Sequence, residues 1–170
     1  MAGPTHYQLK LPQFKDAPKI LIVVAPYYKD IADDLVAGAV AEIEKVGGSH
    51  KIVEVPGALE VPTAVRIGFA QGDFDGFVAL GCVIRGETTH YDTVCNDSSR
   101  AISLLGLQGA WIGNGILTVE NYEQAAVRAD PKGQNKGGGA AAAALHLIAL
   151  SRSMKKADKG IGFLNRDDAK

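Results

Sequence analysis

The run Lys19-Ile20-Leu21-Ile22-Val23-Val24-Ala25 decides how this chain can fold, because apolar residues follow its first lysine without interruption. A continuous apolar run, in place of an alternating pattern, is typical of a strand that is covered on both faces. Residues 76–84, with the sequence Gly-Phe-Val-Ala-Leu-Gly-Cys-Val-Ile, have the same character. Two further segments, 51–55 and 111–117, complete a set of four predicted strands.

Segments with helical spacing separate and follow these strands. Apolar side chains recur in them three and four positions apart, and the first such segment stops at Gly47-Gly48. The expected helices cover 31–46, 58–70, a stretch that follows the polar segment 85–90, 121–129 and 139–154. Strands that alternate with helices imply right-handed crossovers. We therefore predict an α/β fold, a flavodoxin-like three-layer αβα sandwich around a four-stranded parallel sheet.

Length and composition favour a single globular domain. The chain has 170 residues, of which 46% are hydrophobic and 22% charged, and these values are usual for one domain. Residues 1–18 contain prolines and little periodicity, so we expect an N-terminal arm or an added edge strand there. Residues 19–154 form the predicted domain, and the charged tail 155–170 is expected to fray.

Charge, cysteine content and hydropathy exclude several classes of function. The net charge of −1 offers no excess of cations for a nucleic-acid backbone, so no nucleic-acid partner is expected. Cys82 and Cys95 form neither a CxxC motif nor a disulfide framework, which suits a reduced, cytoplasmic location. No apolar run approaches the roughly 18 residues of a membrane span, and residues 1–14 lack a signal-peptide core. We therefore expect no membrane partner.

Polar and aromatic residues follow each predicted strand. In an open parallel sheet, ligands bind beyond the carboxyl ends of the strands. The segments just after the four strands hold aromatic, acidic, hydroxyl and imidazole groups. These segments are 26–28, 56–60, 85–92 and 118–121. We expect them to converge at one edge of the sheet and to form a binding site there.

The segment after the third strand is the most informative. Residues 86–89, Gly-Glu-Thr-Thr, precede a predicted helix, and backbone N–H groups at such a helix start attract phosphate. His90 lies at the same junction and is placed for proton transfer near neutral pH. Alternatively, Thr88, Thr89 or Asp92 caps the helix and His90 is a solvated residue of its first turn. Spacing alone leaves both interpretations open.

A second basic element runs from Arg128 to Lys136. Arginine can hold a phosphate with two hydrogen bonds, whereas lysine acts as a point charge. The alternative, a solvated turn between two helices, is favoured by the pattern alone. Residues 136–139 are not a P-loop, and no GxGxxG motif follows the first strand, which argues against a dinucleotide site. The other histidines are not spaced with His90 as metal ligands, so no metal centre is expected.

Four motifs carry a resemblance to one enzyme family. They are Val-Pro-Gly-Ala-Leu-Glu-Val-Pro at 55–62, Gly-Cys-Val-Ile-Arg-Gly-Glu-Thr-Thr-His-Tyr-Asp at 81–92, Gly-Ile-Leu-Thr at 115–118 and Asn-Lys-Gly at 135–137. In this order, and ahead of an alanine-rich helix, they resemble the lumazine synthase family. The resemblance runs from about Lys19 to Leu150, and its Ile-Arg-Gly-Glu-Thr-x-His block is highly specific.

The resemblance implies an activity and a set of site residues. The family is a group of transferases that condense 5-amino-6-(D-ribitylamino)uracil with 3,4-dihydroxy-2-butanone 4-phosphate. The reaction gives 6,7-dimethyl-8-ribityllumazine, phosphate and water in riboflavin biosynthesis, without metal or organic cofactor. His90 matches the proton-transfer residue. The positions that match the ribitylaminouracil site are Tyr27, Ala58, Leu59, Glu60, Cys82, Val83, Ile84 and Asn114. Those that match the phosphate and butanone site are Glu87, Thr88, Arg128 and Lys136.

Three positions depart from the family pattern. Tyr27 replaces the commoner phenylalanine, Asn114 stands where many members carry an aromatic residue that reaches a neighbouring subunit, and Gly139 replaces an acid. These departures leave room for an alternative, a catalytically weak binding or shell protein. A flavodoxin-like flavin carrier is disfavoured because no Ser/Thr-rich phosphate loop follows the first strand.

The resemblance also implies partners. The family assembles as pentamers whose active sites lie between neighbouring subunits, and some members build sixty-subunit shells. We accordingly expect a homo-oligomer, a pentamer, with a decamer or a 60-mer left open. An association with riboflavin synthase is a further partner that the resemblance suggests.

Overall fold

The computed structural model describes residues 9–158 and contains a four-stranded parallel sheet with the strand order β2-β1-β3-β4. The strands are β1 (Lys19–Val24), β2 (Ser49–Glu54), β3 (Gly76–Ile84) and β4 (Ile112–Val119). All four predicted strands are confirmed, and the central pair is buried as its apolar runs require. Residues 20–24 of β1 and 76–82 of β3 are buried, whereas β2, at the edge, is largely exposed.

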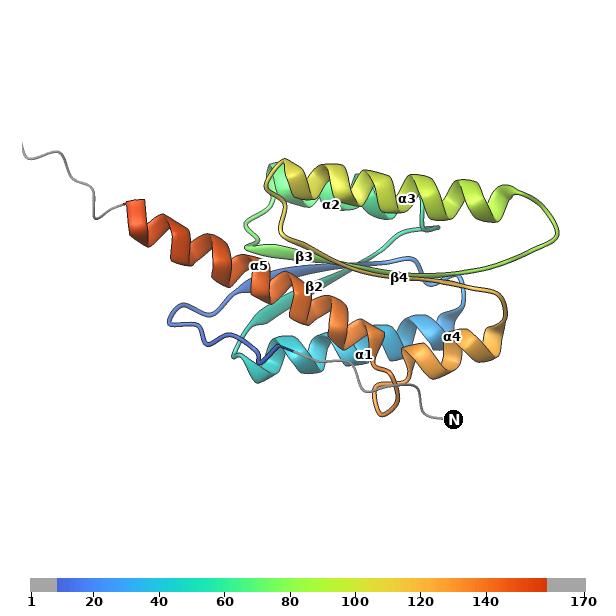
Figure 1. Cartoon of the computed structure of the whole chain (residues 1–170), viewed down its shortest axis with the longest axis horizontal. Coiled ribbons are helices and arrows are strands. Elements are labelled where there is room, and N and C mark those ends of the chain that lie inside the picture. The colour runs from blue at the N-terminus through green and yellow to red at the C-terminus, as the bar shows by residue number, and fades with distance from the viewer. Residues whose placement is uncertain (1–8, 159–170) are drawn as a thin grey trace, which may run out of the picture.

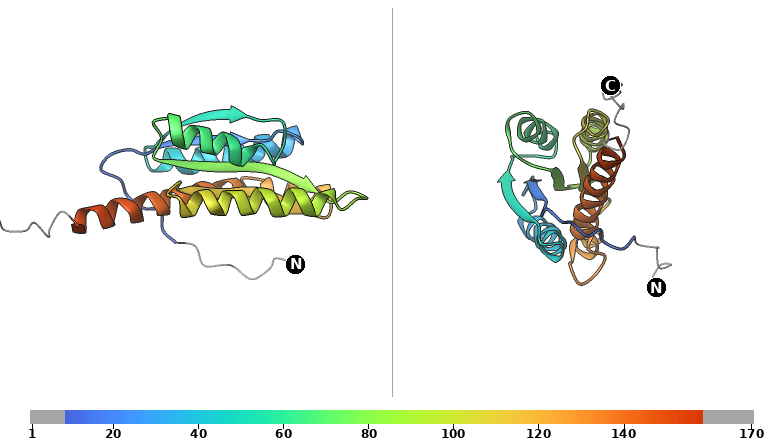
Figure 2. Two further views of the ribbon diagram at one scale, coloured as in Figure 1. Left: turned by 90° about the horizontal axis from the view of Figure 1, so that it is seen from above. Right: turned by 90° about the vertical axis from the view of Figure 1, so that its left-hand side faces the viewer.

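Helices cover both faces of this sheet (Figure 1). On one face lie α2 (Val61–Gln71) and α3 (His90–Leu107), and on the other lie α1 (Lys29–Lys45), α4 (Tyr122–Ala129) and α5 (Lys136–Asp158). Figure 2 shows the same layers from above and from one end. The predicted α/β three-layer fold is confirmed. No helix in the described part of the chain combines the length and apolarity needed to cross a bilayer.

Two helix starts differ from the sequence prediction by three residues, and each has a local cause. α2 begins at Val61, three residues late, because residues 57–60 form a turn and Pro62 favours the first helical turn. α5 begins at Lys136, three residues early, because Asn135 adopts a positive φ of 47° and its side-chain oxygen accepts a hydrogen bond from the Gly138 N–H at 3.1 Å.

Glycine and alanine let α5 approach its neighbours closely. A Cβ atom at Gly137 would overlap the carbonyl oxygen of Leu35 on α1, and one at Gly113 would overlap that of Ala140. The chain therefore uses small residues where backbones touch. This contact fixes the start of α5, where Lys136 lies, against α1.

The ends of the described chain bear on the predicted domain boundaries. Residues 9–18 contain no strand, so the edge-strand alternative does not apply to them, and Arg152 on α5 holds them by donating a hydrogen bond to the Asp16 carbonyl at 2.6 Å. α5 continues to Asp158, four residues past the predicted boundary. Residues 1–8 of the predicted arm and 159–170 of the predicted tail lie outside the described residues.

Candidate active site

A pocket of about 500 Å³ opens at the carboxyl ends of β1, β2 and β3. Its volume suits a small-molecule ligand. It gathers most of the residues that the sequence singled out. Those that line it are Tyr27, Ala58, Leu59, Glu60, Cys82, Val83, Ile84, Thr88 and His90. The expected convergence of strand ends therefore holds for three of the four strands, and the segment after β4 is not part of the lining.

The mouth of the pocket carries an accessible aromatic ring. Tyr27 follows β1 and is 75% exposed, and the Tyr28 ring meets it edge to face with 5.1 Å between the centroids. Burial is the main cause that raises the pKa of Tyr28, with the nearby Cys82 and Tyr27 groups adding to it. The Tyr28 phenol therefore stays neutral near pH 7. Because Tyr27 is largely exposed, its ring is free to stack on a planar ligand.

The floor of the pocket is apolar. Ala58 and Cys82 are nearly buried, with 9% and 8% of their surfaces exposed. Burial raises the pKa of the Cys82 thiol to about 11, and the charge of Asp30 contributes in the same direction. A thiol with so high a pKa is protonated near pH 7 and is a poor nucleophile. Cys82 thus acts here as a small apolar residue with a weak donor.

Glu60 places a carboxylate beside this floor. The Glu60 N–H donates to the Gly57 carbonyl at 3.1 Å, which closes the turn between β2 and α2. A Cβ atom at Gly57 would stand only 2.9 Å from Oε2 of Glu60, so the missing side chain at Gly57 lets the carboxylate fold over the turn. The pocket therefore offers a hydrogen-bond acceptor as well as the aromatic ring of Tyr27.

The backbone of β3 adds polar groups along one side. β1 pairs with β3 only as far as Leu80, whereas β4 pairs with it up to Ile84. The last contact with β1 is at Leu80, whose carbonyl accepts a hydrogen bond from the Ala25 N–H. Beyond it, the side of residues 81–84 that faces β1 has no strand partner among the described residues. Backbone N–H and C=O groups on this edge can bind a planar ligand with amide-like edges.

His90 is the first residue of α3 and lines the pocket. Its N–H donates to the Thr88 hydroxyl at 3.4 Å, a long hydrogen bond. Thr89 occupies the N-cap position but its side chain makes no capping bond. The capping interpretation thus finds support only in the weak Thr88 contact, and the imidazole remains at the pocket wall.

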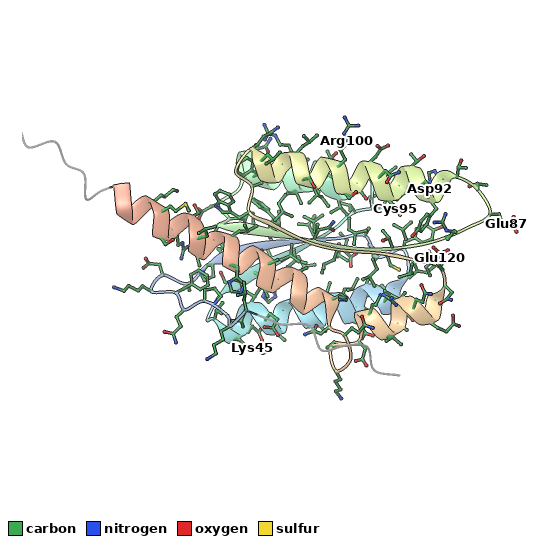
Figure 3. The ribbon with its side chains drawn as sticks, in the orientation of Figure 1. Lys45, Glu87, Asp92, Cys95, Arg100 and Glu120 are labelled. Atoms are coloured by element: carbon green, nitrogen blue, oxygen red, sulfur yellow. The ribbon has the colours of Figure 1, made fainter. Side chains whose placement is uncertain are left out.

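Four residues that the resemblance implied do not line this pocket. Glu87 lies at the outer tip of the loop between β3 and α3 (Figure 3). Arg128 is half-buried and donates to the Gln124 carbonyl at 3.0 Å, and Lys136 is exposed at the start of α5. Asn114 on β4 borders a separate hollow of about 320 Å³, and its side-chain oxygen accepts from the Ile116 N–H at 3.0 Å.

Most of the other lining residues fall within the strand-end segments that the sequence predicted, although they were not named as site residues. They are Tyr28, Gly57, Gly86 and Tyr91. Ala25 and Val94 lie outside those segments and were missed. Val94 follows His90 by four positions, so the helical period places both on one face of α3 and could have identified it. Within residues 9–158, no group of three or more histidine, cysteine, aspartate or glutamate side chains is placed to hold a metal ion.

The fold and this pocket define a class of protein, an α/β protein with a small-molecule site at the carboxyl ends of parallel strands. The family model of 6,7-dimethyl-8-ribityllumazine synthase matches residues 17–152. The chain therefore belongs to this family, the lumazine synthases, which are transferases of riboflavin biosynthesis. The resemblance seen in the sequence motifs is confirmed.

Individual relatives agree. The chain is 53% identical to the 6,7-dimethyl-8-ribityllumazine synthase of Jannaschia sp. (strain CCS1) over 166 residues, which cover 98% of this chain and 93% of the relative. It is 53% identical to the synthase of Novosphingobium aromaticivorans over 132 residues, 78% of this chain and 95% of the relative. The synthase of Methylorubrum populi is 54% identical over 141 residues, 79% of this chain and 83% of the relative.

Proposed function

We propose that this chain condenses 5-amino-6-(D-ribitylamino)uracil with 3,4-dihydroxy-2-butanone 4-phosphate to give 6,7-dimethyl-8-ribityllumazine, phosphate and water. One observation carries the proposal. Tyr27, Glu60 and His90 come from three different strand ends and line one pocket of about 500 Å³. Their groups match the needs of the reaction, which are a stacking surface, an acceptor for hydroxyl groups and a proton-transfer group.

The pyrimidine substrate occupies the sheet side of the pocket. Its ring stacks on Tyr27, and its uracil edge binds the end of β3 at Cys82, Val83 and Ile84, beyond the last residue that pairs with β1. Ala58 and Leu59 line the wall beside it, and the Glu60 carboxylate accepts hydrogen bonds from the ribityl hydroxyls.

His90 transfers protons between the two substrates. The aromatic amine attacks the ketone, an imine forms, phosphate leaves, and the ring closes with loss of water. Each step moves a proton, and an imidazole near pH 7 can both donate and accept one. Both reactants are intrinsically reactive, so holding them in register supplies much of the acceleration.

The phosphate of the second substrate binds the loop that precedes α3, through backbone N–H groups at Glu87 and Thr88, with Arg128 as its cationic clamp and Lys136 as a further basic residue. Thr88 lines the pocket, but the two cations lie outside its lining. We therefore propose that the working site includes more than one chain. A homo-oligomer, a pentamer with sites between neighbouring subunits, would complete it, and a decamer or 60-mer is a larger form of the same assembly.

Two surface features support such an assembly. Leu107 is 87% exposed beside the hollow that Asn114 borders, and Leu150 and Met154 on α5 are also exposed. The Asn114 oxygen is already engaged by the Ile116 N–H, so its amide NH₂ is the group free to meet a neighbour's ligand. Asn114 would then donate a hydrogen bond where other members stack an aromatic ring.

The activity is tested by mixing purified protein with both substrates and following the fluorescence of the lumazine together with released phosphate. We expect both products in equal amounts. Tight binding of the pyrimidine without phosphate release would instead show a weakly catalytic binding protein.

Light scattering of the same sample tests the oligomer. Co-sedimentation with riboflavin synthase tests that proposed partner, and the free thiols Cys82 and Cys95 suit the proposed cytoplasmic location.

A further inference from the structure

Arg85 connects the ends of three elements around the candidate active site. It is the first residue after β3, and its backbone N–H donates to the Val119 carbonyl at 2.9 Å. Its Nε donates to Oε2 of Glu120, just after β4, at 2.8 Å. A second guanidinium nitrogen reaches the Asp92 carboxylate in the first turn of α3 at 3.5 Å. Figure 3 labels the two carboxylate residues, Asp92 and Glu120.

The same guanidinium also covers the residue that follows His90. The central carbon of the Arg85 guanidinium stands 4.0 Å from the centroid of the Tyr91 ring, within the range of a cation–π contact. Tyr91 and Asp92 directly follow His90 on α3. Two residues of this first turn are therefore fixed by one side chain outside the helix.

The loop before His90 is weakly held by other means. Residues 86–89 are exposed, and a Cβ atom at Gly86 would have nothing within 4 Å. The start of α3 lacks a side-chain cap from Thr89. The Arg85 network thus links this helix start to the ends of β3 and β4.

We propose that Arg85 is a positioning residue, which clamps the first turn of α3 to the sheet so that His90 and Thr88 face the pocket. The inference rests on the proposed roles of these two residues. Arg85 is not itself a phosphate ligand in this arrangement, because the Glu120 and Asp92 carboxylates already compensate its charge. An anion would compete with two carboxylates for the same donors.

The two ion pairs contribute little to stability. The Arg85 side chain is 42% exposed, and its partners are 54% and 57% exposed. Exposed ion pairs are weak, so breaking both should lower Tm by only about 2–4 °C. Misplacing a catalytic group by about 1 Å, in contrast, can cost about 10²-fold in rate. A large loss of kcat with a small change in Tm is therefore the signature of positioning.

The test compares Arg85→Met with Arg100→Met. Arg100 is an exposed arginine on α3, the helix that begins at His90, and it lies away from the loop (Figure 3). We expect Arg85→Met to lower kcat by about 10–100-fold with little change in KM for the pyrimidine. Arg85→Lys should regain only part of kcat, since lysine lacks the planar fork that reaches two carboxylates. Arg100→Met should behave as the wild-type protein.

A double-mutant cycle identifies the route of the effect. If Arg85 acts through His90, Arg85→Met should cost less than about 3-fold more in a His90→Ala background. The proposal would be overturned if the losses of kcat in Arg85→Met and His90→Ala multiplied in the double mutant. It would also be overturned if Arg85→Met had a normal kcat, or if it raised only KM for the phosphorylated ketone. If Arg85→Met fails to fold, Glu120→Gln, expected to lower kcat by about 10-fold, takes its place in the cycle. A wild-type protein that makes no lumazine would instead contradict the proposed function.

Discussion

The two halves of the candidate active site are built differently. The proposed pyrimidine half has Tyr27, Glu60 and the end of β3 on sheet ends and short turns, and one chain brings these three together. The phosphate half, with Thr88, Arg128 and Lys136, is spread over an exposed loop, the last turn of α4 and the first residue of α5. Only Thr88 of this second group reaches the pocket.

This difference follows from what positions each group. A parallel sheet brings its strand ends together at one edge, so residues just after strands converge even when they lie far apart in sequence. Helix ends on the far side of the sheet have no such constraint. The pyrimidine half is thus fixed by folding, whereas we expect the phosphate half to be completed by assembly and ligand binding.

The largest effect is expected at His90, where the two halves meet. His90→Ala should lower kcat by about 10²–10⁴-fold, the range of one general acid–base contribution, because positioning of the substrates survives. KM for the pyrimidine should change little, because the residues that hold it are untouched. Steady-state kinetics measures both constants, with circular dichroism as the control for folding. A complete loss of turnover in folded protein would contradict a mainly positional mechanism.

Cys82 tests whether the pyrimidine half is closed in the free chain. Its pKa of about 11, against the ordinary 9.0, leaves about 100-fold less thiolate near pH 8, and the thiol should react with iodoacetamide more slowly by that factor. A Cys95→Ser variant isolates this thiol, and a short cysteine peptide is the reference. Reaction at the peptide's rate would show that the floor is open.

The same shift has a consequence for stability. Below about pH 9 the Cys82 thiol is protonated in both the folded and the unfolded chain, so it adds no pH dependence. Between pH 9 and 11 only the unfolded chain loses the proton, and the free energy of unfolding should fall as pH rises. Cys82→Ala should remove this part of the alkaline slope in urea titrations, and an unchanged slope would contradict the assignment.

Arg128 tests the phosphate half. Arg128→Ala should raise KM for the phosphorylated ketone by about 10–100-fold, the usual contribution of a charge-assisted hydrogen bond to phosphate. KM for the pyrimidine should stay within about 3-fold, because the two halves are built on separate elements. Arg66→Ala, which removes an exposed cation on α2, is the matched control. An unchanged KM for the ketone would exclude Arg128 as the clamp.

The positions of the residues proposed to bind the pyrimidine were easier to predict from the sequence than the positions of those proposed to bind the phosphate, for a physical reason. Apolar runs identify the strands, and the strand-end rule then places Tyr27, Glu60 and His90 at one edge without any tertiary information. The same rule misplaced the segment after β4, which does not line the pocket. Strand order, which puts β4 at the far edge from β2, decides that outcome, and no local pattern reports it.

Contacts that join distant residues were also beyond the sequence. Arg85 and Glu120 are 35 positions apart, and their ion pair depends on the register of β3 against β4. The early start of α5 accompanies the positive φ of Asn135 and the close approach of Gly137 to Leu35 on α1. Such features arise from packing between elements, whereas hydrophobic periodicity reports only what one element buries.

The smallest effect is expected at the mouth of the pyrimidine half, where Tyr27 replaces the family's commoner phenylalanine. Tyr27→Phe keeps the ring, and the side chain is 75% exposed, so KM for the pyrimidine should change by less than about 3-fold. Tyr27→Ala removes the stacking surface and should raise this KM by about 2–10-fold, since aromatic pairs contribute about 0.5–1.5 kcal/mol. KM for the phosphorylated ketone is the internal control in both variants. An equal loss in Tyr27→Phe and Tyr27→Ala would show that the hydroxyl, rather than the ring, binds the substrate, and that this half of the site is specified by a hydrogen bond instead of a stack.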